Sequence, residues 1–405
     1  MLDARERRAA RQSELQQRFR GQPLLCFTMN IAGEIKNSSL IRFAFMHGVN
    51  QLKKLNPIHT ELYHEPTGNE CYMLFNLKAE TLKEKTVLIE DGTKLGRLFD
   101  MDVLDASHTK VGRKEPRKCL ICSQNAAECA RSRAHGIDAI QTKTNEILKD
   151  FAAELLARAA VDALKEEVCI TPKPGLVDRN NNGAHRDMNI ELFFSSADCL
   201  QPFFVRAAQL GLKGDSDFDS LRAIGIEAEC AMLKTTGGVN THKGANYSML
   251  LLLCAIADLL ANEKDSPFEK VKELAWAGHE PLNTHGAAMK QQHGAFGVIG
   301  EARTGFCHAR RAVNYLKNMP AHLVLLHIIS ELDDTNVLYR GGIEASNRLK
   351  AEAKRILTLP QSEQHDAIIA LDEECIRSNI SAGGAADMLA LALFLSNICG
   401  YITIM

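Results

Sequence analysis

The stretch with the highest density of chemically capable side chains runs from Thr171 to Asn189 and reads TPKPGLVDRNNNGAHRDMN. Its prolines and glycine interrupt regular secondary structure, and a run of polar and charged residues then follows. A solvated linker between domains is the alternative, but linkers are usually simple in composition. We therefore expect this loop to supply binding and catalytic groups, namely Lys173, Asp178, Asn181, Asn182, His185 and Asp187.

Polar residues also interrupt the helical pattern of the C-terminal half at four places. These are TTGGVNTHKGAN (235–246), HGAFGVIGEARTG (293–305), DDTNVLYRGG (333–342) and SAGGAAD (381–387). Each alone fits capping or turn chemistry, as for an acid near a helix start, but four in one helical domain predict a shared polar pocket. A lysine beside backbone amides at a helix N-terminus favours phosphate, although the spacing matches neither a P-loop nor a dinucleotide fingerprint. The expected pocket residues are Asn240, His242, Lys243, Glu301, Asp333, Asp334, Asn336 and Arg340, with His285, Gly286 and Asp387 nearby.

The N-terminal half carries two acids at alternate positions of an apolar run, LGRLFDMDVLD. On a strand, side chains alternate, so Asp100 and Asp102 point to the same face. Two adjacent carboxylates repel, and Mg²⁺ is typically held by one or two carboxylates plus substrate phosphates. The pair therefore predicts either a Mg²⁺–triphosphate site, as in nucleotidyl transfer, or two acids on a solvated strand face.

A cysteine cluster follows, with Cys119, Cys122 and Cys129 succeeded by His135. The C-x-x-C spacing and the two later residues are compatible with a Cys₃His zinc site. Buried small residues at a helix start are the alternative, because free cysteine is often part of a core. Basic side chains in and before this segment suit a polyphosphate; the expected ones are Arg97, Arg117 and Arg131.

The elements that must position these groups differ between the two halves of the chain. The first half has an α+β pattern, for which we predict a helix at 3–20, a strand at 24–31, a helix capped by Ser38 or Ser39, and strands at 71–77, 86–90 and 95–104. Residues 138–167 are rich in helix formers and predict a helical connector, with the domain boundary placed after residue 148. The remainder, 149–405, predicts an all-α domain. Its expected helices are 190–211, 218–233, 246–260, 267–277, 304–315, 322–332, 344–357, 363–377 and 386–399.

The overall composition is that of an ordinary globular protein, with 45% hydrophobic and 24% charged residues. A net charge of −2 does not suggest nucleic-acid binding. The charged start does not look like a signal peptide, and the apolar run 249–260 is too short to span a bilayer and includes Asp258. Twelve cysteines without a disulfide-framework spacing favour a reducing compartment. We therefore expect a cytoplasmic protein.

The sequence GRLFDMDV, the cysteine cluster and MNIAGEIKNSSLI (29–41) together resemble the apo-citrate lyase phosphoribosyl-dephospho-CoA transferase family. The resemblance covers roughly residues 3–140, and Ala32 replaces the proline of that pattern. It implies a nucleotidyltransferase-like domain. Such a domain would transfer a phosphoribosyl-dephospho-CoA group to a serine of the citrate lyase acyl carrier subunit and release pyrophosphate.

The loop 171–189, GVNTHKG, DTN…RGG and the GGxAD element resemble, in the same order, the triphosphoribosyl-dephospho-CoA synthase family. The match covers roughly residues 150–405 and departs from the pattern at Ile299 and Ala382. It implies that ATP and 3′-dephospho-CoA are converted to 2′-(5″-triphosphoribosyl)-3′-dephospho-CoA and adenine. The fusion would then be a bifunctional transferase in which the product of one domain is the substrate of the other.

The resemblance also implies a mechanism, in which a ribose hydroxyl attacks the ribose C1 of ATP through an oxocarbenium-like transition state. The loop acids and Glu301 would act as base or stabiliser, and His185 would protonate the departing adenine. Mg²⁺ is expected at Asp333 with Asp334, and separately at Asp100 with Asp102. Two other classes remain open. One is an adenine-releasing nucleoside or ADP-ribosyl-type glycohydrolase. The other is a carrier-protein binding module with an inactive helical domain.

Overall fold

The computed structural model describes residues 2–214, 216–278, 289, 292, 294–295 and 297–402. It divides into two compact units, Met1–Ala152 and Ala153–Met405. The division lies four residues beyond the boundary placed after residue 148. His285 and Gly286 lie outside the described residues.

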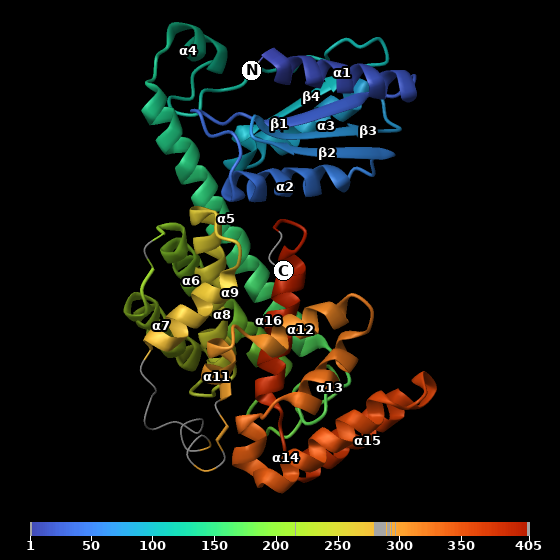
Figure 1. Cartoon of the computed structure of the whole chain (residues 1–405), viewed down its shortest axis with the longest axis vertical. Helices are drawn as coiled ribbons and strands as arrows, with labels where there is room; N and C mark the ends of the chain where they lie inside the picture. Colours follow the sequence, from blue (N-terminus) through green and yellow to red (C-terminus); the bar gives the residue numbers. More distant parts are fainter. Residues whose placement is uncertain are drawn as a thin grey trace. The chain divides into compact units, whose positions relative to one another are not determined.

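The N-terminal unit is built on a four-stranded antiparallel sheet with strand order β2-β3-β1-β4. The strands are β1 (Leu24–Met29), β2 (His59–Glu65), β3 (Gly68–Leu74) and β4 (Phe99–Leu104). Helix α1 (Leu2–Arg18) lies on one side of the sheet, and α2 (Ser39–Lys53) lies on the other, as Figure 1 shows. Leu15 of α1 packs on Leu24 and Cys26, so the even-numbered side chains of β1 face α1. The odd-numbered ones face α2, where the rings of Phe27 and Phe45 stack.

The structure corrects two of the predicted strands in this unit. Residues 86–90 belong to helix α3 (Ala79–Asp91), whose inner face includes the polar residues Lys83, Thr86 and Glu90. Those buried polar side chains stand at helical spacing, which hid the helix from a reading of apolar residues alone. The stretch 95–104 begins with a 3-10 turn, η1 (Leu95–Leu98), and only its second part is β4.

Strand β2 was not predicted at all. Its sequence, HTELYHE, has one apolar aliphatic residue, and every position is at least partly exposed. It pairs with β3 alone and forms an edge of the sheet. An edge strand with polar residues on both faces carries no alternating hydrophobic pattern, so the periodicity test cannot detect it.

Helix α5 (Ile137–Cys169) confirms the helical connector, and its last part belongs to the C-terminal unit. The described residues of that unit form helices and connecting loops, without a strand. The helices are α6 (Ile190–Leu212), α7 (Phe218–Thr235), α8 (Lys243–Asn262), α9 (Pro267–Ala277), α11 (Gly297–Arg303), α12 (Cys307–Leu316), α13 (Ala321–Glu331), α14 (Thr335–Leu357), α15 (Gln361–Arg377) and α16 (Gly383–Ile398). The short helix α11 was not predicted, and α14 begins nine residues earlier than expected, with a kink at Gly342.

Helix α8 is the core of the C-terminal unit. It contacts α6, α7, α9, α11 and α16, and Figure 1 shows it among these neighbours. Of the helices in the described residues, α8 has the length and apolarity needed to cross a membrane, but 83% of its most apolar window is buried. A helix that is apolar on all sides and covered by other helices is typical of the core of a folded unit.

Candidate active sites

The loop 171–189 is held in shape by its own carboxylate, Asp178. One oxygen accepts hydrogen bonds from the backbone N–H of Asn180 and Asn181 at 2.7 and 3.1 Å, and the other accepts from the N–H of Lys173 at 3.2 Å. Asp178 is buried, so these bonds replace its hydration. Its carboxylate is thus occupied in folding the loop.

A second acid, Asp372 of α15, accepts hydrogen bonds from the loop and so connects the loop to that helix. Its two oxygens accept from Gly175 N–H and from the Asn181 side-chain amide, both at 2.8 Å. The amide oxygen of Asn181 in turn accepts from Gly183 N–H at 2.6 Å. Asp372 was missed by the sequence analysis, because it lies in a helix of ordinary composition 191 residues from Asn181.

We expect Gly175→Ala to lower the stability of the C-terminal unit. Gly175 has φ +68°, and a Cβ there would stand 2.1 Å from the Ile380 carbonyl oxygen. Left-handed strain and a backbone clash together cost about 2–4 kcal/mol. The urea-unfolding transition followed by helical circular dichroism measures this. Gly237→Ala is the matched control, because its φ is +65° with nothing near the added Cβ; equal costs for both variants would refute the clash.

The four polar clusters and the loop meet at one cavity of about 940 Å³ in the C-terminal unit. This confirms the expected shared pocket and lies within the size range of small-molecule sites. The predicted residues that line the cavity are Lys173, His185, Asn240, His242, Lys243, Glu301, Asp333, Asp334, Asn336 and Arg340. The predicted loop residues Asp178, Asn181, Asn182 and Asp187 are not among the lining residues.

One end of the cavity is buried and charged. The Lys173 ammonium lies 2.6 Å from a carboxylate oxygen of Glu167 on α5, and both side chains are almost completely buried. A buried pair of this kind is stable only while both partners remain. Glu167 was missed by the sequence analysis because it belongs to the long connector helix, where glutamate is simply a good helix former.

His242 precedes α8 and reaches the same end of the cavity. Burial, with a smaller contribution from Lys173, lowers the pKa of His242 to about 3, so the imidazole is neutral. Its Nδ1 lies 2.8 Å from Ser196 Oγ, and Ser196 also accepts from the Thr241 hydroxyl at 2.7 Å. Nε2 is buried and has no hydrogen-bond partner among the described residues. An unpaired buried nitrogen in a cavity wall suits a polar group of a ligand.

Two aspartates complete this buried end. Asp334 caps α14 by accepting from Asn336 N–H at 2.8 Å, and it also accepts from Ala385 N–H at 2.9 Å. Asp387 on α16 is partly buried in the cavity wall, and desolvation together with the charges of Asp334 and Glu167 raises its pKa well above its usual value. Asp387 therefore keeps its proton to a higher pH than an ordinary aspartate does.

Other predicted cavity residues have partners of their own. His185 bonds to Ser381 Oγ at 3.0 Å and lies 3.4 Å from an Arg340 nitrogen. Burial and Arg340 lower the pKa of His185, so a smaller fraction of this imidazole carries the proton that the predicted acid must donate. Further pairs are Lys243 with Glu229, Asp333 with Lys350, and Glu301 with His308.

In the N-terminal unit, Asp100 and Asp102 occupy the same face of β4. Strand pairing places Asp100 opposite Thr28 and Asp102 opposite Cys26, so both point to the α1 side of the sheet. Burial and the charge of Asp102 raise the pKa of Asp100. Lys110 approaches Asp102 at 2.6 Å. The two carboxylates thus repel each other at a partly buried site, which is the electrostatic arrangement that a divalent cation relieves.

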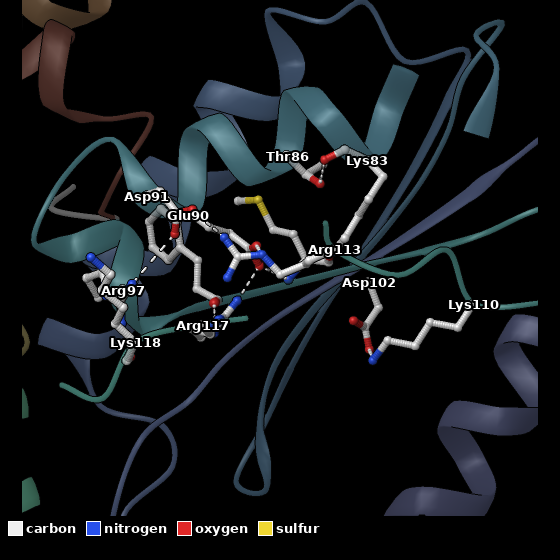
Figure 2. Close-up of polar contacts among 12 residues, drawn as sticks. Lys83, Thr86, Glu90, Asp91, Arg97, Asp102, Lys110, Arg113, Arg117 and Lys118 are labelled. Atoms are coloured by element: carbon white, nitrogen blue, oxygen red, sulfur yellow. Dashed lines mark hydrogen bonds and ion pairs between the residues drawn. The ribbon is translucent and has the colours of Figure 1, made fainter. Parts of the chain in front are cut away.

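Glu90 of α3 lies next to two basic side chains, Arg113 and Arg117, as Figure 2 shows. It is buried, and it accepts from Arg117 at 2.6 Å and from Met101 N–H at 2.8 Å, while Arg113 lies 3.8 Å away. Arg117 also donates to the Phe99 carbonyl at 2.8 Å. The sequence analysis does not include Glu90, because it predicts a strand at 86–90, where the structure has α3.

The remaining predicted arginines have structural partners. Arg97 donates to the carbonyl of Lys118 and lies 3.6 Å from Asp91. Arg131 is exposed on α4 (Ala126–Ser132) and donates to the Ala127 carbonyl within that helix at 3.3 Å. Of the predicted arginines, Arg117 is the one whose positive charge acts on Asp100, where it opposes the rise in the pKa of that carboxyl group.

Comparison with known proteins gives matches over both units. The family model described as "CitG: ATP:dephospho-CoA triphosphoribosyl transferase" matches residues 153–403, and "CitX: Apo-citrate lyase phosphoribosyl-dephospho-CoA transferase" matches residues 1–151. A relative from Haemophilus influenzae named Protein CitXG is 34% identical, covering 97% of this chain and 94% of its own. Protein CitXG of Leuconostoc mesenteroides subsp. cremoris is 30% identical, and the match covers 99% of this chain and 97% of that protein. A Haemophilus ducreyi protein named 2-(5''-triphosphoribosyl)-3'-dephosphocoenzyme-A synthase is 32% identical, and the match covers 68% of this chain and 98% of that protein.

Proposed function

Because this chain belongs to the CitX and CitG families, joined as in the relatives named Protein CitXG, we propose that its two units perform successive reactions. At the family level it is a bifunctional transferase of citrate lyase prosthetic-group biosynthesis that uses ATP. Residues 149–405 convert ATP and 3′-dephospho-CoA to 2′-(5″-triphosphoribosyl)-3′-dephospho-CoA and adenine. Residues 1–148 transfer the phosphoribosyl-dephospho-CoA group to a serine of the citrate lyase acyl carrier subunit and release pyrophosphate.

The observation that supports the first reaction is the buried charged end of the cavity. The bond from the ribose C1 of ATP to adenine breaks, and a bond from C1 to the acceptor hydroxyl oxygen forms. Positive charge develops on the ribose in between, and the carboxylates of Glu167 and Asp334 would stabilise it in a site shielded from water. The hydroxyl loses a proton and adenine gains one, so the site needs both a base and an acid.

Asp387 is the acid in this proposal, in place of His185. Its raised pKa favours the protonated carboxyl group, whereas the lowered pKa of His185 favours the neutral imidazole. Glu301 lines the cavity and is our candidate for the base that receives the hydroxyl proton. The triphosphate, which is retained in the product, would lie at the start of α8, where Lys243 and the helix N-terminus attract anions.

The second reaction is assigned to the Asp100 and Asp102 face of β4. These carboxylates fit Mg²⁺ by their donor chemistry and by their mutual repulsion, and bound Mg²⁺ would neutralise charge on the departing pyrophosphate. Lys110 and Arg117 would orient the phosphates through charge. We do not extend Mg²⁺ to Asp333 and Asp334, because Asp333 pairs with Lys350 and Asp334 accepts backbone hydrogen bonds instead.

The test is adenine release from ATP and Mg²⁺, measured with and without 3′-dephospho-CoA. We expect release only when 3′-dephospho-CoA is present, followed by a mass increase of the citrate lyase acyl carrier subunit when that protein is added. Release without 3′-dephospho-CoA would indicate the glycohydrolase alternative. Carrier binding without adenine release or a mass increase would indicate the binding-module alternative.

A further inference from the structure

Residues 104–143 of the N-terminal unit fold without a hydrophobic core. None of these residues, all of them described, is buried, and α4 buries none of its side chains. Figure 1 shows α4 lying away from the sheet. The backbone is nevertheless tightly turned, with an isolated bridge between Lys118 and Asn125. A segment that cannot bury apolar surface needs a crosslink or a metal ion to hold such a conformation.

Four side chains of this segment bring their ligand atoms together. Cys119, Cys122, Cys129 and His135 each offer one atom, and all four atoms lie within 4.8 Å of one another. Cys122 Sγ is 3.4 Å from Cys129 Sγ and 3.2 Å from His135 Nε2. Tetrahedral zinc, with Zn–S about 2.3 Å and Zn–N about 2.0–2.1 Å, separates its ligand atoms by roughly 3.5–3.8 Å. The two measured separations are close to those values.

The local backbone supports the same arrangement. The Cys119 sulfur accepts a hydrogen bond from Ile121 N–H at 3.5 Å, so the C-x-x-C residues form a turn around the sulfur. Cys129 lies on α4, and the left-handed residue Arg133 ends that helix and directs the chain back to His135. None of the four residues is buried, which removes the alternative that these cysteines are core residues.

We propose that Cys119, Cys122, Cys129 and His135 bind one Zn²⁺ ion with a structural role. A Cys₃His set with four protein ligands leaves no open position for a reacting molecule. The ion would fasten the turn that follows Arg117, whose guanidinium contacts Glu90 and the Phe99 carbonyl. The site is independent of the proposed function, and zinc binding can be measured without any enzyme assay.

The first experiment is elemental analysis of the full-length protein purified without added metal or chelator. We expect about one zinc per chain, and a loss of that zinc in Cys122→Ser. Cys230→Ser is the matched control, because Cys230 is an exposed cysteine of α7 in the other unit, and it should keep the metal. A wild-type protein without zinc, or equal zinc in wild type and Cys122→Ser, would overturn the proposal.

Two further measurements do not depend on the folding of a variant. Thiol titration of the unfolded, unreduced wild-type chain should count all twelve cysteines, whereas ten, with the disulfide mapped by peptide mass to the cluster, would contradict zinc. Trypsin cleavage within residues 104–143 should accelerate at least tenfold when a strong chelator removes the metal, because the basic residues there lose their fixed backbone. An unchanged cleavage rate after zinc removal would refute the structural role.

Discussion

Asp387→Asn is expected to lower the rate of adenine release by about 10²- to 10⁴-fold, the usual contribution of general acid catalysis. The substitution preserves the shape of the side chain, which matters because Gly244 packs directly against the Asp387 carboxylate. It removes the carboxyl group whose raised pKa favours the protonated form. The measurement is the steady-state release of adenine from ATP in the presence of 3′-dephospho-CoA.

Two comparisons separate this role from a structural one. Asp366→Asn, at an exposed acid of α15, should leave the rate unchanged. Attachment to the carrier subunit from ready-made triphosphoribosyl-dephospho-CoA should also be unchanged in Asp387→Asn, because we assign that reaction to the other unit. If Asp387→Asn kept the full rate of adenine release, the acid would have to be another residue, with His185 the next candidate.

The sequence predicted many of the groups that line the cavity but not the burial of each group. Motif residues such as Lys173, His242 and Arg340 were found because they stand in loops or at helix ends, where polar side chains interrupt a helical pattern. Their protonation could not be predicted, since it depends on burial. Burial lowers the pKa of His185, the predicted acid, and raises the pKa of Asp387, which the sequence indicated only as a helix-start residue.

The missed residues share a physical cause. Glu167, Asp372 and Glu90 are acids inside helices, where their composition is unremarkable. Each becomes important only through a partner brought close by tertiary structure, such as Lys173 for Glu167. For the same reason the sequence did not predict that Asp178 accepts hydrogen bonds from the backbone of its own loop. The sequence shows that many polar residues surround Asp178 in the loop. It does not show that backbone N–H groups of the loop donate to this carboxylate.

Asp100→Asn is expected to reduce attachment to the carrier subunit by at least about 10²-fold, because one of the two carboxylates that would hold Mg²⁺ is lost. Adenine release should stay at the wild-type rate, since that reaction is assigned to the other unit. The measurement is the mass increase of the citrate lyase acyl carrier subunit over time. Asp150→Asn, at an exposed acid of α5, is the control and should retain both activities.

The unfolding midpoint of Asp100→Asn is a second test of this role, and we expect it not to fall although attachment is lost. Asp100 and Asp102 repel each other, and burial adds to the cost of charging Asp100. Replacing Asp100 by a neutral amide removes that repulsion, so without Mg²⁺ the unfolding midpoint should stay equal or rise. Loss of attachment together with an undiminished midpoint identifies a carboxylate kept for function. A lowered midpoint would mean that Asp100 supports the fold, and loss of both reactions would contradict the assignment of one reaction to each unit.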